Sequence, residues 1–208
     1  NILAPAGSVV ATDPMTGELL AMASFPTFDP AEFVNGISFA QFEILNDPAN
    51  YQPILNRAIQ ENYALGSTFK SFVALAALEK GYLGPESRIV EARDGRIEDT
   101  FNYTLPQCRT DFEAADTCEF TSPGVNPGSR TFNLVEAITI SSDVFFYKLG
   151  AEGFFEEPRG PEGDESIQTM ARRFGFGSAT AIQVPFEKAG VVPDRAYLDE
   201  GFEAGRFI

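Results

Sequence analysis

The sequence predicts an α+β fold, and three observations carry that prediction. A β-rich opening at residues 7–24 is followed by helical stretches and long loops, without the regular alternation of strands and helices that builds a parallel sheet. Hydrophobic residues make up 44% of the 208 residues, and 20 residues are phenylalanine, which is enough apolar material for a globular core. No internal repeat is visible.

The opening segment is expected to form an antiparallel hairpin over residues 7–24. Its two β-rich runs meet at Asp13–Gly17, where the sequence Asp-Pro-Met-Thr-Gly is typical of a turn. Two short helices are expected next, beginning at Asp29 and at Ser38. The second would carry three apolar residues on one face: Phe39, Phe42 and Leu45.

Residues 67–80 predict an amphipathic helix that Gly81 ends. Ser67 stands at its start and Lys70 follows three residues later, so both share a face near the positive end of the helix dipole. A neutral lysine can take the proton that a serine must lose to act as a nucleophile. Because the chain contains no histidine, a Ser-His-Asp triad is excluded. The spacing alone is also common on solvated helix faces.

The remaining chain alternates loops and helices. Residues 84–130 are polar and rich in Gly, Pro and Asp, so we expect a loop-rich insert with short strand-like pieces such as Thr100–Leu105. Residues 131–149 predict an amphipathic helical stretch interrupted near Ser141. The acidic segment 151–165 is expected to be a solvated connecting loop.

One more helix is expected near the end of the chain. Asp164 would cap it, and Gly175 would end it after Phe174.

Composition limits the classes of partner. Asp and Glu number 30 against 15 Lys and Arg, and the resulting charge of −15 should repel nucleic acids and anionic lipid surfaces. No apolar run approaches the ~20 residues that cross a bilayer, and the chain begins on strand-like sequence without a signal peptide. With two cysteines and no histidine, a zinc site is disfavoured, and we expect neither metal nor cofactor.

Several segments together resemble the transpeptidase domain of penicillin-binding proteins. Asn56–Tyr63 followed by Gly66–Lys70 resembles the nucleophile region of that family, and the opening hairpin is also similar. Ser141-Ser142-Asp143 resembles the family's second motif, Ser-x-Asn, with Asp in the third place. Three later segments match as well: 174–177, 185–187 and 190–193. The resemblance covers essentially the whole chain in the right order, and it is strongest to elongation-type class B members, penicillin-binding protein 2.

The resemblance implies a serine β-lactamase-like fold, an antiparallel sheet with a helical subdomain. The family's third motif, Lys-Thr/Ser-Gly, does not occur in the chain. We therefore expect residues 1–208 to be the first two thirds of a transpeptidase domain, incomplete at the C-terminus. Its parts would be the opening hairpin (1–28), a mainly helical region with both motifs and the insert (29–174), and a return towards the sheet (175–208).

The resemblance also implies roles for the site residues. Ser67 would attack a peptide carbonyl of a peptidoglycan stem peptide or the ring carbonyl of a β-lactam, with Lys70 accepting its proton. The Ser67 backbone N–H would supply half of an oxyanion hole, and Ser141 would pass a proton to the leaving amine. Asp143 is expected to bind substrate. An ionised carboxylate only accepts hydrogen bonds, so it suits a substrate N–H or Lys70 itself, and beside Lys70 it would favour the ammonium form.

The family location would be the extracytoplasmic face of the bacterial cytoplasmic membrane, with the anchor upstream of Asn1 and elongation-machinery membrane proteins as partners. In that compartment Cys108 and Cys118, ten residues apart in a polar segment, would form a disulfide, although two unrelated thiols are the simpler alternative. Two other functions stay open. One is a penicillin-binding sensor or scaffold without turnover, and the other is a serine β-lactamase, which would need a group that activates water.

Overall fold

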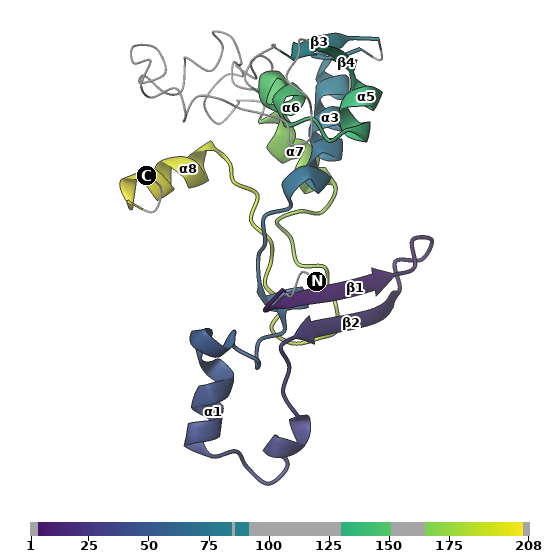
Figure 1. Cartoon of the computed structure of the whole chain (residues 1–208). Helices are drawn as coiled ribbons and strands as arrows, with labels where there is room; N and C mark the ends of the chain where they lie inside the picture. Colours follow the sequence, from purple (N-terminus) through teal and green to yellow (C-terminus); the bar gives the residue numbers. More distant parts are fainter. Residues whose placement is uncertain (1–3, 85, 92–129, 151–164, 206–208) are drawn as a thin grey trace. The chain divides into compact units, whose positions relative to one another are not determined.

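The structure is a computed structural model that describes residues 4–84, 86–91, 130–150 and 165–205. The chain divides into two compact units (Figure 1). Asn1–Tyr63 and Ser178–Gly190 form the first, named here the hairpin unit. Ala64–Gly177 and Val191–Ile208 form the second, the helical unit. The combination of antiparallel strands and helices confirms the predicted α+β class.

The hairpin unit opens on two antiparallel strands, β1 (Gly7–Thr12) and β2 (Leu19–Phe25), which lie side by side in Figure 1. The predicted turn joins them. The Asp13 carboxylate accepts a hydrogen bond of 2.7 Å from the backbone N–H of Met15, and Gly17 adopts a φ of +76°, which glycine tolerates without strain.

Four short helices follow in the hairpin unit: η1 (Pro30–Phe33), α1 (Phe39–Asn46), η2 (Pro48–Asn50) and α2 (Arg57–Gln60). The predicted caps are present, because the Asp29 carboxylate accepts from Ala31 N at 2.9 Å and the Ser38 hydroxyl accepts from Gln41 N at 3.2 Å. Of the three apolar residues expected on one face of α1, only Leu45 is buried.

Arg57 anchors the loop before α2. Its side chain is buried, and its guanidinium donates to the backbone carbonyls of Tyr51, Gln52 and Leu55. Its backbone N–H donates to the Ser24 hydroxyl on β2 at 3.1 Å. A buried charge is tolerated when it is hydrogen-bonded, so these contacts to three carbonyls give the arginine a structural role.

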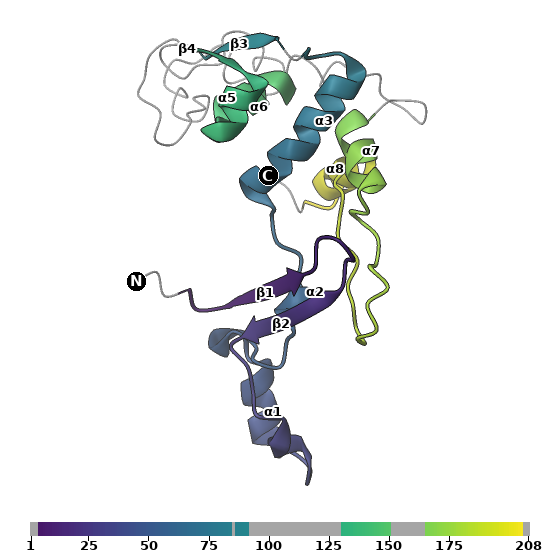
Figure 2. The same ribbon diagram turned by 90° about the vertical axis from the view of Figure 1, so that its right-hand side faces the viewer.

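The helical unit is built around α3 (Lys70–Lys80), which η3 (Gly66–Phe69) precedes and Gly81, with φ +76°, ends as predicted. Its other elements are β3 (Arg88–Glu91), β4 (Arg130–Asn133), α5 (Leu134–Thr139), α6 (Asp143–Leu149), α7 (Ser166–Arg173) and α8 (Arg195–Glu203). Figure 2 shows α5 and α6 on one side of α3 and α7 on the other.

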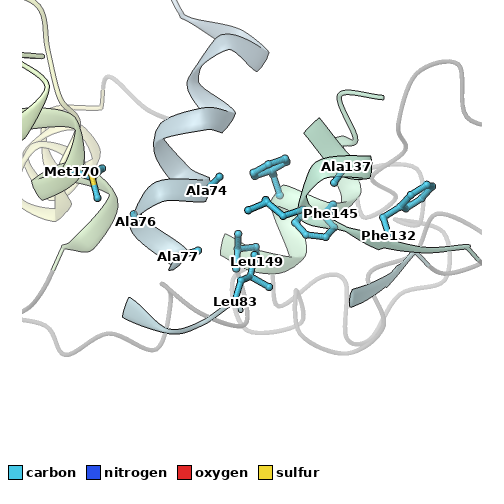
Figure 3. Close-up of a cluster of buried hydrophobic side chains, with 11 residues drawn as sticks. Ala74, Ala76, Ala77, Leu83, Phe132, Ala137, Phe145, Leu149 and Met170 are labelled. Atoms are coloured by element: carbon cyan, nitrogen blue, oxygen red, sulfur yellow. The ribbon is translucent and has the colours of Figure 1, made fainter. Parts of the chain in front are cut away.

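The core of the helical unit follows from that arrangement. Buried alanines on α3 let its neighbours approach closely: Ala74, Ala76 and Ala77. In Figure 3 Met170 of α7 lies on one side of α3, and Phe145 and Leu149 of α6 lie on the other. Phe145 is completely buried.

Strands β3 and β4 were not predicted. They pair antiparallel with Ile89 opposite Phe132, and both side chains pack into the core. The expected helix over residues 131–149 is therefore wrong at its start. Asn133 caps α5 in a capping box with Glu136. Because the helix begins only after this cap, the residues before Leu134 can adopt the extended conformation of a strand.

The end of the chain also differs from the sequence prediction. Glu165 takes the N-cap position of α7, and the predicted cap, Asp164, lies outside the described residues. Helix α8 was not predicted. Part of 175–208 does join the hairpin unit, where the Lys188 N–H donates to the Ile59 carbonyl at 2.8 Å, but residues 191–205 belong to the helical unit. The predicted division into domain parts stays a prediction.

Several predictions lie outside the described residues. They concern the strand-like piece Thr100–Leu105, the disulfide between Cys108 and Cys118, and all but the last residue of the acidic loop expected over 151–165. Within the described ranges, no helix combines the length and the apolar character that a membrane span requires.

Replacing Asp194 with asparagine is expected to make α8 less sensitive to acid. The pKa of Asp194 lies below its ordinary value, first because the Tyr197 backbone N–H donates to its carboxylate and then because the Arg172 guanidinium lies beside it, at 2.6 Å. A lowered pKa stabilises the folded state at neutral pH, and this stabilisation is lost as the pH falls below about 4. Asparagine keeps the cap without the charge.

Amide hydrogen exchange of α8, corrected for intrinsic exchange rates, measures this effect at about pH 6 and about pH 3. Wild type should lose more protection on acidification than Asp194→Asn. An equal acid response in both proteins would contradict the expectation.

Candidate active site

Ser67 lies in the 3₁₀ turn η3 directly before α3. Gly66 permits that turn with a φ of +57°, and the Lys70 backbone N–H donates to the Ser67 carbonyl. The Thr68 hydroxyl donates to the Leu65 carbonyl at 2.6 Å, which fixes the turn further. Ser67 is exposed, so its hydroxyl is accessible to a substrate.

The Lys70 ammonium contacts the segment that carries the second motif. It donates to the Ser141 carbonyl at 2.7 Å, to the Ser141 hydroxyl at 3.2 Å and to the Asp143 carboxylate at 2.5 Å. The side chain is only 12% exposed, and its nitrogen lies 5.7 Å from the centre of the Phe146 ring. These hydrogen bonds occupy all three ammonium donors. Within the part of the chain that the structure describes, none of them goes to the Ser67 hydroxyl.

Ser141 adopts an unusual backbone conformation. Its φ of +56° lies in the left-handed region, which costs a residue with a side chain about 1–2 kcal/mol. This conformation turns both the carbonyl and the hydroxyl of Ser141 towards Lys70, where each accepts a hydrogen bond. The helical stretch is interrupted at Ser141, as the sequence predicts, and backbone strain of this kind is frequent at functional sites.

Ser142 holds this segment in place, although the sequence pattern did not single it out. Its side chain is completely buried, and its hydroxyl accepts from the Phe145 backbone N–H at 3.0 Å as the N-cap of α6. Its own backbone N–H donates to the Ala137 carbonyl at 2.9 Å. The sequence pattern that could have identified this cap is a serine followed directly by an acidic residue and an apolar helix.

The site therefore joins three of the predicted residues directly. Lys70, Ser141 and Asp143 form one hydrogen-bonded group, and Ser67 lies one turn before Lys70. Of the two partners that suit the Asp143 carboxylate, it contacts Lys70. An ammonium group has no free electron pair, so proton transfer from Ser67 to Lys70 requires Lys70 to lose a proton first.

Replacing Ser142 with alanine is expected to destabilise the helical unit by about 1–2 kcal/mol, because the Phe145 N–H would lose its buried acceptor. Urea unfolding measures the loss. Ser38→Ala is the matched control, since Ser38 caps α1 in the same way but is exposed, so water can replace its hydroxyl. Equal losses in the two variants would show that burial of the Ser142 cap has no special importance.

Comparison with known proteins identifies related sequences. The family model described as the penicillin binding protein transpeptidase domain matches residues 7–204. The peptidoglycan D,D-transpeptidase MrdA of Acinetobacter baumannii is 33% identical over 188 residues, covering 90% of this chain and 24% of that protein. MrdA of Escherichia coli is 30% identical over 197 residues, covering 94% of this chain and 27% of that protein. The chain thus spans about a quarter of the length of these relatives.

Solved structures agree with the sequence matches. Pseudomonas aeruginosa PBP2 in complex with WCK 5153 is similar with a TM-score of 0.68 at 31% identity, covering 98% of this chain and 39% of that one. Helicobacter pylori PBP2 has a TM-score of 0.71 at 28% identity, covering 94% of this chain and 32% of that one. Both support the predicted transpeptidase fold. Since the family model spans nearly all of its length, the chain belongs to the penicillin-binding protein transpeptidase domain family.

Proposed function

We propose that Ser67 forms an acyl-enzyme with the D-Ala-D-Ala end of peptidoglycan stem peptides, and that penicillin acylates the same residue. The observation that carries the proposal is the contact between Lys70, one turn after Ser67, and the Ser141–Asp143 segment. The relatives that bear the name D,D-transpeptidase support the same reaction class.

In the proposed acylation, the Ser67 hydroxyl oxygen bonds to the carbonyl carbon of the penultimate D-alanine while neutral Lys70 takes the hydroxyl proton. The amide C–N bond then breaks, and Ser141 passes a proton to the departing amine of the terminal D-alanine. An amine of a second stem peptide next attacks the ester and restores the Ser67 hydroxyl. With a β-lactam the ring amide opens instead, and the ester remains.

Asp143 has two proposed roles. One carboxylate oxygen, 2.5 Å from the Lys70 nitrogen, orients Lys70 and is a nearby acceptor for the proton that Lys70 must lose. An ionised carboxylate has about four acceptor sites, so Asp143 can also accept an N–H of the bound substrate. The role of Asp143 in substrate binding thus does not require it to release Lys70.

The proposed setting is the elongation machinery at the extracytoplasmic face of the bacterial cytoplasmic membrane. The support is a solved complex between Helicobacter pylori PBP2 and MreC. This chain is similar to a chain of that complex, with a TM-score of 0.71 at 28% identity. The partners proposed here are therefore membrane proteins of that machinery.

Incubation of the full-length protein with fluorescent penicillin, followed by intact mass measurement, tests the proposal. A stable adduct, together with cross-linking of stem peptides, supports the transpeptidase. A stable adduct without cross-linking indicates a sensor, rapid release of hydrolysed penicillin indicates a β-lactamase, and no adduct indicates a scaffold. The last three outcomes would each overturn the proposed activity.

We also expect the 208 residues alone to react poorly with penicillin. They contain no Lys-Thr/Ser-Gly motif, which in this family faces the serine, supplies the second oxyanion donor and adds a cation to the cleft. Loss of one oxyanion donor alone lowers the rate on the order of 100-fold. Acylation rates of the 208-residue chain and of the full-length protein are the measurement. Equal rates would mean that these residues make a complete site.

A further inference from the structure

Four phenylalanine rings from two distant segments meet beside the start of α3. Phe69 and Phe72 come from η3 and α3, and Phe174 and Phe176 follow α7. The Phe176 ring lies 6.0 Å from that of Phe69 and 4.9 Å from that of Phe72, and the Phe174 ring lies 5.1 Å from that of Phe72. These three contacts are edge-to-face, the arrangement that the ring quadrupoles favour. We call these residues the four-ring cluster.

The segment that presents Phe176 is itself held firmly. The Phe176 backbone N–H donates to the Ala171 carbonyl of α7 at 3.1 Å. Glycines on either side adopt left-handed conformations, with φ +89° at Gly175 and +81° at Gly177. A Cβ at Gly177 would lie 3.1 Å from a methyl group of Val192, so the chain is closely packed there. Phe176 is therefore a fixed surface against which Phe69 rests.

The position of Phe69 in the sequence gives this contact its importance. Phe69 lies between Ser67 and Lys70 and is the last residue of η3, a turn of only four residues. Lys70 is held independently by Ser141 and Asp143. When the turn moves, the Ser67 hydroxyl moves with it, whereas the Lys70 amine stays bound to Ser141 and Asp143. Movement of the turn therefore changes the distance between the Ser67 hydroxyl and the Lys70 amine.

We propose that Phe176 is a positioning residue for Ser67, acting through the ring of Phe69. The inference rests on the proposed function, since it concerns the geometry of proton transfer from Ser67 to Lys70. Without the Phe176 ring, Phe69 keeps its ring contact with Phe72 but loses the ring contact with Phe176, which comes from outside its own helix. A turn at a helix end held only by local contacts frays.

The test compares Phe176→Leu, Phe176→Tyr and Phe132→Leu in the full-length protein. Leucine removes the ring but keeps an apolar side chain, and tyrosine keeps the ring. Phe132→Leu is the matched control, because Phe132 is a buried phenylalanine of the same unit outside the four-ring cluster. Two readouts are needed: the rate constant of penicillin acylation, separated from the affinity of the preceding complex, and hydrogen exchange of residues 66–72.

Phe176→Leu is expected to lower the acylation rate constant about tenfold while the preceding affinity stays nearly unchanged, because misplacement of a reacting group affects the chemical step. Exchange of residues 66–72 should rise in the same variant. Phe176→Tyr should react like wild type, and Phe132→Leu should lose stability without losing the rate constant or the protection of 66–72.

Three results would overturn the proposal. Two concern Phe176→Leu: unchanged hydrogen exchange of residues 66–72, or an unchanged acylation rate constant. The third is a loss of acylation rate in both Phe176→Leu and Phe132→Leu that is proportional to the loss of folding stability in each variant. Failure of the proposed function has a separate signature. If wild type forms no adduct at Ser67 but Phe176→Leu still raises the exchange of 66–72, the turn is positioned as inferred and only the chemistry is wrong.

Discussion

Replacing Ser67 with alanine is expected to abolish covalent labelling by penicillin. No other serine of the described residues combines exposure at a helix start with a lysine one turn later whose amine is held against the second motif. Alanine removes the only oxygen that could form the ester and changes the surface of an exposed turn very little. Intact mass after incubation with penicillin measures the adduct, and peptide mapping places it.

Ser71→Ala is the matched control for this prediction. Ser71 is an exposed serine in α3, directly after Lys70, so the control changes the same chemical group four residues away from Ser67. Ser71→Ala should be labelled like wild type. An adduct on Ser141, or labelling that persists in Ser67→Ala, would show that the nucleophile has been wrongly assigned.

Replacing Lys70 with alanine is expected to lower the acylation rate about 1,000-fold, within the range by which general bases contribute. Lys70 and Ser141 contact each other directly, at 2.7 Å through the carbonyl and at 3.2 Å through the hydroxyl. When two residues act in one proton relay, the rate losses caused by replacing each of them do not add in the double variant. The double variant Lys70→Ala/Ser141→Ala should therefore be little slower than Lys70→Ala alone, as measured by acylation kinetics.

Two controls sharpen the lysine prediction. Lys80→Ala makes the same change at the other end of α3 and should leave the acylation rate unaltered. Lys70→Ala also removes the ion pair between Lys70 and Asp143, so Lys70→Ala/Asp143→Asn should remain equally slow. Recovery of the rate in that double variant would mean that the loss came from the changed charge balance and not from a missing base. Multiplicative losses for Lys70 and Ser141 would contradict the shared relay.

Local sequence signals predicted the elements that depend on local chemistry. The hairpin followed from its turn residues, the first helices from the caps Asp29 and Ser38, and the end of α3 from Gly81. Strands β3 and β4 were missed because each has only four residues and gains its partner across about 40 residues of chain, so neither carries a periodic pattern of its own. Helix α8 did carry a cap signal at Asp194, within a segment that the resemblance assigned to the sheet.

The sequence singled out the residues that the structure brings together in the candidate site, but it did not predict their geometry. The spacing of Ser67 and Lys70 predicted a shared helix face, whereas the left-handed conformation of Ser141 has no signal in a serine. The sequence allowed Asp143 either a substrate N–H or Lys70 as its partner. Only the three-dimensional arrangement of α3 and α6 distinguishes these partners, because the two residues are 73 positions apart.

The left-handed conformation of Ser141 has a consequence for engineering. Glycine adopts a φ near +56° without the steric penalty, so a screen that rewards thermal resistance would select glycine at this position. The same change would delete the hydroxyl that contacts Lys70. The selected protein would therefore have a higher unfolding temperature and a lower rate of the proposed acylation. Libraries of variants designed to raise thermal stability should therefore keep serine at position 141, even though glycine would relieve the backbone strain there.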